Sequence, residues 1–166
     1  MSIMKILETM DYGVAPESLD NANKWLAEHK AKFGLFIDGD FRKSAKAEYF
    51  NTYNPATGEK LAEITQASEK DVNMAVTAAD LAQDSWAELT GFQRAKYLYS
   101  IARLIQKHAR LFAVVESLDN GKPIRESRDV DIPLVIRHFY HHAGWAQLMD
   151  EKLDDYELEA QMITHD

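Results

Sequence analysis

Residues 48–65 read EYFNTYNPATGEKLAEIT, and this stretch decides how the first part of the chain folds. The aromatic residues from Glu48 to Tyr53 favour an extended strand. Pro55 and Gly58 then predict a turn, because proline fixes its own φ angle and glycine tolerates a left-handed backbone. The alternating residues from Lys60 to Thr65 predict a strand that returns beside the first.

A helix and a second turn signal precede this stretch. Apolar residues at helical spacing predict a short helix that ends near Phe33-Gly34, and they are Leu19, Ala22, Trp25, Leu26 and His29. Asp38-Gly39 then lies between apolar residues, which is typical of a two-residue β-hairpin. We therefore expect a small antiparallel sheet over residues 35–65.

Two capping boxes announce helices in the second part of the chain. Ser68 to Asp71 opens a helix with one apolar face, formed by Val72, Ala75, Val76, Ala79, Ala82 and Trp86. Thr90 to Gln93 opens a longer helix with the stripe Leu98, Ile101, Ala102, Ile105, Ala109, Phe112 and Val115. This helix is expected to end at Asn120-Gly121-Lys122-Pro123, where glycine suits a left-handed cap and proline prevents continuation.

A third long helix is predicted from Asp131 to about Met149, with Pro133 in its first turn. Between Ile132 and Met149 its only charged residue is Arg137, so the helix is apolar nearly all round. The predicted fold class is α+β, a small antiparallel sheet (about 35–65) followed by a bundle of long helices (about 70–149).

Composition and charge exclude several classes of protein. The chain has 166 residues, which suits one globular domain. It contains no Cys, which excludes a disulfide scaffold, a zinc finger, an iron–sulfur site and a cysteine nucleophile. A formal net charge of -8 argues against nucleic acid as the main partner, since phosphate binding needs clustered Lys and Arg. No apolar run approaches the roughly 18 residues of a membrane span, so we expect no membrane association and a cytoplasmic location.

Residues 150–166 carry seven acidic residues and one Lys, which predicts a solvated tail or an interaction tail. The glycines form neither a dinucleotide fingerprint nor a P-loop. His138, His141 and His142 lie close together on the third predicted helix. They are expected to pack or to accept hydrogen bonds, and the alternative is a metal or haem site, which would need carboxylates that are absent nearby.

Asp119 is a second candidate site residue. It falls in the last turn of the second predicted long helix, where the helix dipole disfavours a carboxylate. The residue either caps a turn or holds a cation together with unpaired helix carbonyls, since hard cations prefer oxygen ligands.

Four motifs occur in a fixed order along the chain: Asn54-Pro55-Ala56-Thr57-Gly58-Glu59, Trp86 before a capping box, Leu118-Asp119-Asn120-Gly121-Lys122-Pro123, and Ala143-Gly144-Trp145-Ala146. Together they resemble the aldehyde dehydrogenase superfamily over about residues 34–157. The opening segment, Glu8 to Gly13 with Pro16-Glu17-Ser18, resembles the subgroup related to the family-16 members.

Enzymes of this family oxidise aldehydes to carboxylic acids with NAD(P), through a cysteine thiohemiacetal, hydride transfer and thioester hydrolysis. Their oxyanion Asn, phosphate-contacting Lys and glycines, general-base Glu and nucleophilic Cys come after the matched segment. The resemblance therefore assigns no catalytic and no cofactor-binding residue to this chain. It implies the N-terminal part of the fold without a complete dinucleotide-binding domain, inactive alone and unable to bind NAD(P) by itself.

Residues 158–166 do not look like the family's continuation, which predicts a division into residues 1–157 and a separate tail. The tail is expected to mark a truncation, a frameshift or an engineered end. The resemblance also implies a site for Na⁺ or K⁺ formed by Thr52, the Tyr53 carbonyl and Asp119, with a further ligand after residue 166. The helix that begins near Asp131 borders the family's substrate tunnel, which implicates Val130 and Leu134 as its wall, and plain core packing is the alternative.

The third helix is too apolar for a chain of this size to cover it alone. We therefore expect self-association or binding to another aldehyde dehydrogenase subunit. Three interpretations remain open: an N-terminal segment of an NAD(P)-dependent aldehyde dehydrogenase, an interaction or regulatory module that docks on itself or on full-length subunits, and a His-based metal or haem module.

Overall fold

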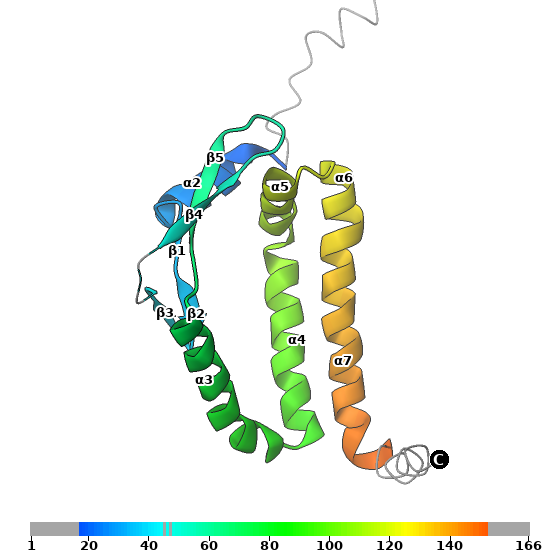
Figure 1. Cartoon of the computed structure of the whole chain (residues 1–166). Coiled ribbons are helices and arrows are strands. Elements are labelled where there is room, and N and C mark those ends of the chain that lie inside the picture. Colours follow the sequence, from blue (N-terminus) through cyan, green and yellow to red (C-terminus); the bar gives the residue numbers. More distant parts are fainter. Residues whose placement is uncertain (1–16, 45, 47, 153–166) are drawn as a thin grey trace, which may run out of the picture.

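The computed structural model describes residues 17–44, 46 and 48–152. Strands and a short helix lie at one end of the molecule, and long helices extend from them (Figure 1). The elements in chain order are α2 (Leu19–Glu28), β1 (Lys32–Phe33), β2 (Leu35–Ile37), β3 (Asp40–Arg42), β4 (Tyr49–Tyr53), β5 (Lys60–Thr65), α3 (Glu69–Ala87), α4 (Gly91–Lys107), α5 (Ala109–Asn120), α6 (Ile124–Glu126), the π-helix η1 (Ser127–Asp131) and α7 (Ile132–Lys152). This order confirms the α+β class predicted from the sequence.

Both predicted turns between strands form. β2 and β3 pair antiparallel around Asp38 and Gly39, whose φ angles of 57° and 78° are the pair of left-handed values that a two-residue hairpin requires. β4 and β5 pair antiparallel around the turn that contains Pro55 and Gly58.

Both strand pairs within residues 35–65 are antiparallel as predicted, but they belong to two sheets instead of one, and β1, which precedes this range, adds a parallel pair. β1 runs parallel to β5, and the order of the larger sheet is β1-β5-β4, while β2 and β3 form a separate hairpin. The cause lies at the end of α2, where Lys30 and Ala31 adopt φ angles of 56° and 46°. This left-handed turn reverses the chain, and the carbonyl of Ala31 accepts a hydrogen bond from the Glu63 amide at 2.8 Å, which places β1 beside β5.

Both predicted capping boxes are present. The Ser68 hydroxyl accepts from the Asp71 amide at the start of α3, and the Thr90 hydroxyl accepts from the Gln93 amide at the start of α4. In each box the side chain three residues on accepts in return from the backbone amide of the capping residue.

The expected uninterrupted helix from Thr90 to Asn120 is divided in two at His108. This residue has φ of -106° and ψ of 15°, outside the helical region, and it separates α4 from α5. The break changes the direction of the chain, so that α4 lies along α7 while α5 contacts α2 and η1. The third helix begins at Ile132, one residue later than predicted, because the five preceding residues form the π-helix.

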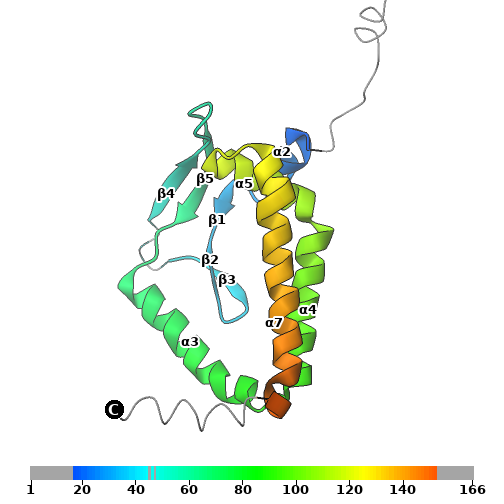
Figure 2. The same cartoon turned by 90° about the vertical axis from the view of Figure 1, so that its right-hand side faces the viewer.

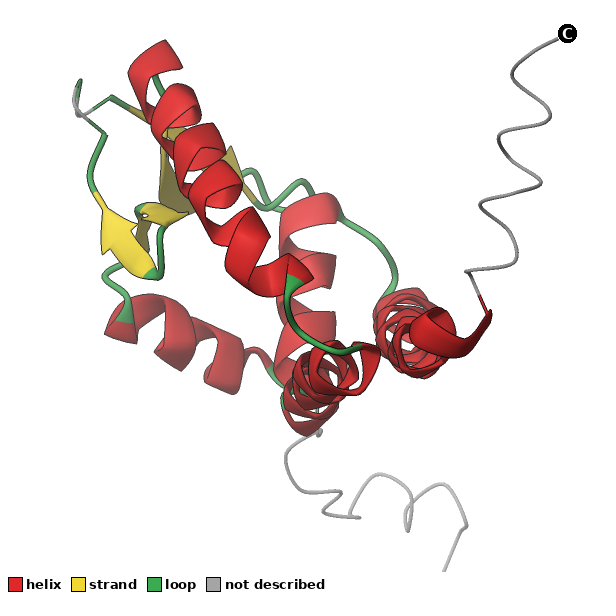
Figure 3. Cartoon of the chain, turned by 90° about the horizontal axis from the view of Figure 1, so that it is seen from below, coloured by secondary structure: helices red, strands yellow, loops and turns green. Residues whose placement is uncertain are grey.

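α4 and α7 lie side by side and antiparallel, and Figure 3 shows both nearly end-on. Their contact is built on small side chains, and the buried residues of this core are Ala95, Ala143 and Ala146, with Leu98 and Tyr99 packed against them. Alanine allows two helix backbones to approach closely, which explains why this pair forms the main packed unit.

α3 extends away from the α4–α7 pair (Figure 2). Its predicted apolar face is formed, but the side chains on it are exposed, including Val72, Val76 and Trp86. Only Asp71 is buried in this helix. Within the described part of the chain, none of the helices has the length and apolar character needed to cross a membrane.

Candidate functional site

Two sequence motifs that lie far apart along the chain meet at the end of α5. The hydroxyl of Thr52, at a β-bulge in β4, donates a hydrogen bond to Oδ1 of Asp119 in the last turn of α5. These two residues are 67 positions apart in the sequence. The fold therefore joins the strand that precedes the Asn54-Pro55 turn to the helix end that precedes Gly121.

Gly121 makes the second contact between the same motifs. Its φ of 81° is a left-handed value that ends α5, and a Cβ at this position would lie 2.7 Å from Cγ of Pro55. A side chain would thus be strained by the backbone angle and would also collide with the proline ring. Glycine is required here for both reasons, and the second reason could not be read from the sequence.

Two of the three predicted cation ligands, Thr52 and Asp119, are in contact at this junction. Thr52 is half-buried, Asp119 is exposed, and the carbonyl of Tyr53 follows Thr52 directly in the chain. A hydroxyl and a carboxylate in contact at the end of a helix supply oxygen atoms, which are the ligands that hard cations prefer. The residues present therefore fit a monovalent cation chemically.

An apolar pocket of about 450 Å³ opens beside this pair, and it was not predicted from the sequence. Its wall is formed by α2, the larger sheet and α5, and includes Trp25, Leu26, Phe33, Phe50, Leu61, Ile64, Val115 and Leu118 together with Thr52 and Asp119. Aromatic residues in three separate elements were the only sequence feature that could have indicated the pocket. The fold was needed to show that they line one cavity.

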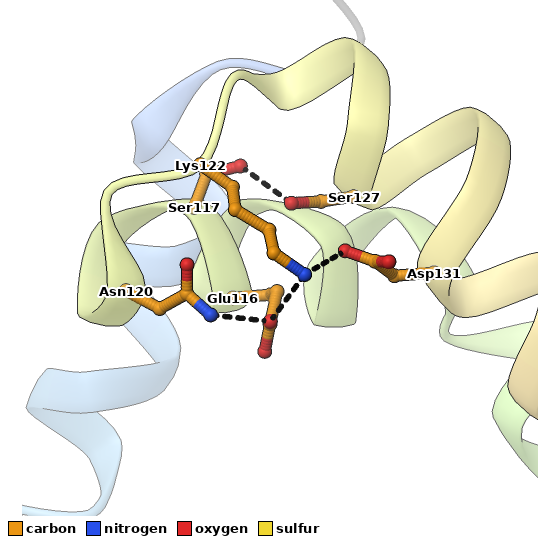
Figure 4. A network of polar contacts seen from close by, with 6 residues as sticks. All are labelled: Glu116, Ser117, Asn120, Lys122, Ser127 and Asp131. Atoms are coloured by element: carbon orange, nitrogen blue, oxygen red, sulfur yellow. Dashed lines mark hydrogen bonds and ion pairs between the residues drawn. The ribbon is translucent and has the colours of Figure 1, made fainter.

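A second polar cluster lies beyond Gly121 and links α5 to the start of α7 (Figure 4). Nζ of Lys122 lies 2.7 Å from Oδ2 of Asp131, the last residue of η1, and 3.9 Å from Oε1 of Glu116 on α5. Asn120 Nδ2 donates to the same Glu116 oxygen at 2.9 Å. The lysine therefore lies between two carboxylates that belong to different helices.

A hydrogen bond between two serines reinforces this link. The Ser117 hydroxyl on α5 lies 3.1 Å from the hydroxyl of Ser127, the first residue of η1, which is completely buried. The hydrogen bond to Asp131 raises the pKa of Lys122 above its ordinary value of 10.5, and partial desolvation opposes the rise. The cluster thus holds both ends of the π-helix, and no pattern in the sequence indicated it.

The residues predicted to form a tunnel wall lie directly after this cluster. Val130 is in η1 and Leu134 is in the first turn of α7, and they are 51% and 43% exposed. Neither is packed as a core residue within the chain. They are four positions apart, the spacing at which side chains share one face of a helix.

The three histidines of α7 are exposed, and they make the hydrogen-bonding and packing contacts expected from the sequence. The indole N–H of Trp145 donates to Nε2 of His141 at 3.0 Å. His138 and His142 stack with ring centroids 6.3 Å apart. Among the described residues, no group of three or more His, Cys, Asp or Glu side chains is arranged to hold a metal ion.

Comparison with known proteins supplies the family. The model of the family described as the aldehyde dehydrogenase family matches residues 41–165. The chain belongs to the aldehyde dehydrogenase family. The resemblance predicted from the four motifs is thereby confirmed, and the motifs that carry it include the two that meet at Gly121.

Solved structures of aldehyde dehydrogenases share this part of the fold. The NAD⁺ complex of the Bacillus cereus aldehyde dehydrogenase is 40% identical over 74% of this chain, with a TM-score of 0.70. HpcC from Thermus thermophilus is 32% identical over 81% of the chain, with a TM-score of 0.73. The NAD-dependent aldehyde dehydrogenase from Sinorhizobium meliloti is 29% identical over 70% of the chain, with a TM-score of 0.67.

This aldehyde dehydrogenase chain spans about a quarter of the length of those relatives, 25% for the Bacillus cereus enzyme and 26% for HpcC. The family match extends beyond residue 157 into the predicted tail, whose separateness stays a prediction. Residues 153–166 lie outside the described residues, as does the segment from Glu8 to Gly13 on which the subgroup resemblance rests.

Proposed function

We propose that this chain supplies the N-terminal strand and helix segment of an NAD(P)-dependent aldehyde dehydrogenase. The observation that carries the proposal is the junction at Gly121, where the Asn54-Pro55 turn and the Asp119 to Pro123 segment pack together. The four motifs of the resemblance do not merely occur in order, since two of them form one structural unit. The 40% identity to an enzyme solved with NAD⁺ supports the same proposal.

In this proposal the chain forms part of the enzyme's scaffold and does not supply the catalytic nucleophile. Formation of a thiohemiacetal requires a cysteine thiolate, and this sequence has no Cys. None of the described residues is assigned to the binding of NAD(P). The cofactor, when bound, would accept the hydride. We expect the purified chain alone to produce no NADH or NADPH with a panel of aldehydes, as followed by nucleotide fluorescence.

A chimera tests the positive part of the proposal. Residues 17–152 replace the corresponding segment of the Bacillus cereus aldehyde dehydrogenase, and NAD⁺-dependent aldehyde oxidation is measured. We expect turnover, because the replaced segment has the same fold and 40% identity over most of the chain. A chimera that folds and binds NAD⁺ but does not oxidise aldehydes would contradict the proposal.

The proposal includes a site for Na⁺ or K⁺ at Thr52, the Tyr53 carbonyl and Asp119. The contact between Thr52 and Asp119 at the end of α5 supports it, because a cation there offsets the unfavourable position of a carboxylate near helix carbonyls. Melting temperatures should be higher in NaCl or KCl than in tetramethylammonium chloride at equal concentration. Asp119→Asn should abolish the difference, whereas Asp84→Asn, in the last turn of α3, should leave it intact.

We further propose that Val130 and Leu134 face the aldehyde in the assembled enzyme. Their exposure within this chain supports this role, since apolar side chains that the chain itself does not cover are available to a substrate. In the active chimera, Leu134→Ala should change the KM ratio between a short and a long aldehyde. An unchanged KM ratio would contradict the proposal and would mean that other residues form the wall of the substrate tunnel.

A second candidate function is an interaction module that docks on itself or on a full-length aldehyde dehydrogenase subunit. Exposed apolar side chains on α7 favour it, and they are Leu134, Val135, Trp145, Leu148 and Met149. Sedimentation at micromolar concentration should then show a dimer that Leu148→Glu disrupts and Arg137→Glu does not. A monomer at all concentrations would exclude the self-docking form. In either case we place the protein in the cytoplasm, without membrane or nucleic acid as a partner.

A further inference from the structure

The segment from Lys122 to Asp131 contains the only described π-helical turn, and its geometry depends on contacts at both ends. A π-helix closes hydrogen bonds over five residues instead of four, so it holds one more residue per turn than an α-helix. If η1 relaxed to α-helical geometry, the residues before α7 would shift by one position, about 100° of rotation around the axis. The side chains of Ser127 and Val130 would then point elsewhere.

Two observations show that α7 itself is fixed while the π-helix is held separately. α7 packs lengthwise on α4 through Ala143 and Ala146, which are buried far from the turn. The π-helix, in contrast, is tied to α5 by the Ser117–Ser127 hydrogen bond and by Lys122, which reaches Asp131 at 2.7 Å. A change in the turn would therefore rotate residues 127–131 and leave Leu134 in place.

The charges at this point explain why the lysine matters. Oxygen atoms of Glu116 and Asp131 lie within 3.9 Å and 2.7 Å of one ammonium group. Without that positive charge, two carboxylates on different helices would face each other and repel. Repulsion would move Asp131, the last residue of η1, away from α5 and would favour the relaxed turn.

We propose that Lys122 is a positioning residue: by joining α5 to Asp131 it keeps the π-helical turn in place, and thereby fixes how residues 127–131, Val130 among them, are rotated relative to Leu134 on the aldehyde-facing wall. The inference rests on the proposed function for what this wall faces. The geometry of the turn is a property of the chain itself and is measured at residue 127 without aldehyde. The proposal for the turn and the proposal for the wall can therefore fail independently of each other.

The absence of native cysteine allows a direct test on the full chain. A single reporter, Ser127→Cys, occupies a completely buried position, and a second, Leu134→Cys, occupies a position that is 43% exposed. Each reporter is combined with Lys122→Met, Lys122→Arg, Asp131→Asn or Asp129→Asn, and the rate of modification by a maleimide is measured. Asp129→Asn is the matched control, because Asp129 pairs with Arg128 inside η1 at 2.6 Å and is not linked to α5 by that pair.

We expect Lys122→Met and Asp131→Asn to accelerate modification at position 127 by at least tenfold and at position 134 by less than twofold. Lys122→Arg should restore protection, and Asp129→Asn should retain it. Equal acceleration at both positions would show loss of general stability and would overturn the proposal. Unchanged protection at position 127, or acceleration by Asp129→Asn, would overturn it as well. If Lys122→Met fails to fold by circular dichroism, Asp131→Asn decides the outcome by the same criteria.

Discussion

Helices α3 and α7 both carry large apolar side chains, but they are held in the molecule in different ways. α7 packs lengthwise on α4 through buried alanines, and two polar contacts cross the same interface, from Tyr140 to Gln106 and from Tyr99 to Gln147. α3 instead is attached at its first turn, where Asp71 is buried and accepts from the hydroxyls of Ser44 and Ser68 at 2.5 Å and 2.7 Å. Val76 and Leu81 on the same helix remain 63% and 76% exposed.

This difference shows that an apolar stripe along a helix is not sufficient for that helix to pack against another. α4 and α7 meet through small residues that face one another. α3 also has alanines on its apolar face, Ala75, Ala79 and Ala82, but it is held by a polar anchor at its start. Its contacts within the chain are with β2 and, through Trp86, with the Tyr97 ring at 5.6 Å. The apolar face of α3 therefore remains uncovered by the described residues and is suited to bind another surface.

The largest expected effect comes from overfilling the α4–α7 contact. Ala143→Leu introduces a branched side chain at a completely buried position and should destabilise the chain by about 1–3 kcal/mol. For a chain of this size, each kcal/mol corresponds to roughly 2–4 °C in Tm, measured by circular dichroism. The neighbouring Gly144→Ala is the control: a Cβ there meets nothing within 4 Å, so it should raise stability by about 0.5–1 kcal/mol. An unchanged Tm for Ala143→Leu would mean that the helices separate in solution.

The polar anchor of α3 should give the next largest effect. Asp71→Ala removes the acceptor for two hydroxyls and one backbone amide at a position that is 2% exposed, and should cost about 2 kcal/mol. Gln93→Ala disrupts the corresponding capping box of α4, which is exposed, and should cost about 0.5 kcal/mol. Chemical unfolding of both variants measures the two values. Equal costs would show that burial adds nothing to the anchor.

Substitutions of the exposed apolar side chains of α3 should have little effect in this chain. Val76→Ala and Leu81→Ala remove side chains that are already in water, so each should change stability by less than about 0.5 kcal/mol. A buried leucine would lose about 2–5 kcal/mol in the same exchange. A loss in that range for Leu81→Ala, measured by urea unfolding, would show that this side chain is covered in solution.

The smallest expected effects are the pH responses of two ion pairs outside these helices, one in the larger sheet and one between α5 and η1. Two lysines, Lys60 and Lys32, hydrogen-bond to Glu63 in the sheet and lower its pKa below 4.5. This stabilisation is present above pH 4.5 and is lost as the pH falls through the lowered value. For Lys122 the pKa is raised above 10.5, so its stabilisation is present below pH 10.5 and is lost as the pH rises through the raised value. The Tm differences that Glu63→Gln and Lys122→Met produce should therefore shrink at opposite ends of the pH range.

Much of the fold could be predicted from interactions between residues that are close in the sequence. The Asp38-Gly39 hairpin, the turn at Pro55 and Gly58, and both capping boxes follow from backbone preferences and hydrogen bonds between residues a few positions apart. The motifs that indicated the aldehyde dehydrogenase family are of the same local kind. For the candidate site, the sequence supplied the identities Thr52 and Asp119 through the resemblance, and the structure brought them into contact.

Features that depend on distant residues could not be predicted. The parallel pairing of β1 requires a left-handed turn at Lys30 and Ala31, and neither residue favours such a turn over the preceding helix. The interruption at His108 contains no glycine or proline, the usual sequence signals of a helix end. It depends on where α5 meets α2 and η1, which is a property of packing.

The sequence by itself determined the two turns between strands, the capped starts of α3 and α4, the family and the need for glycine at the end of α5, because each is encoded by neighbouring residues. Only the tertiary structure decided that Gly121 also lies against Pro55, that Lys122 joins α5 to Asp131 across a π-helix, and that the face of α3 stays exposed. The physical reason is that these contacts depend on the relative placement of whole helices. That placement is set by the volumes buried between helices, which no short stretch of residues specifies.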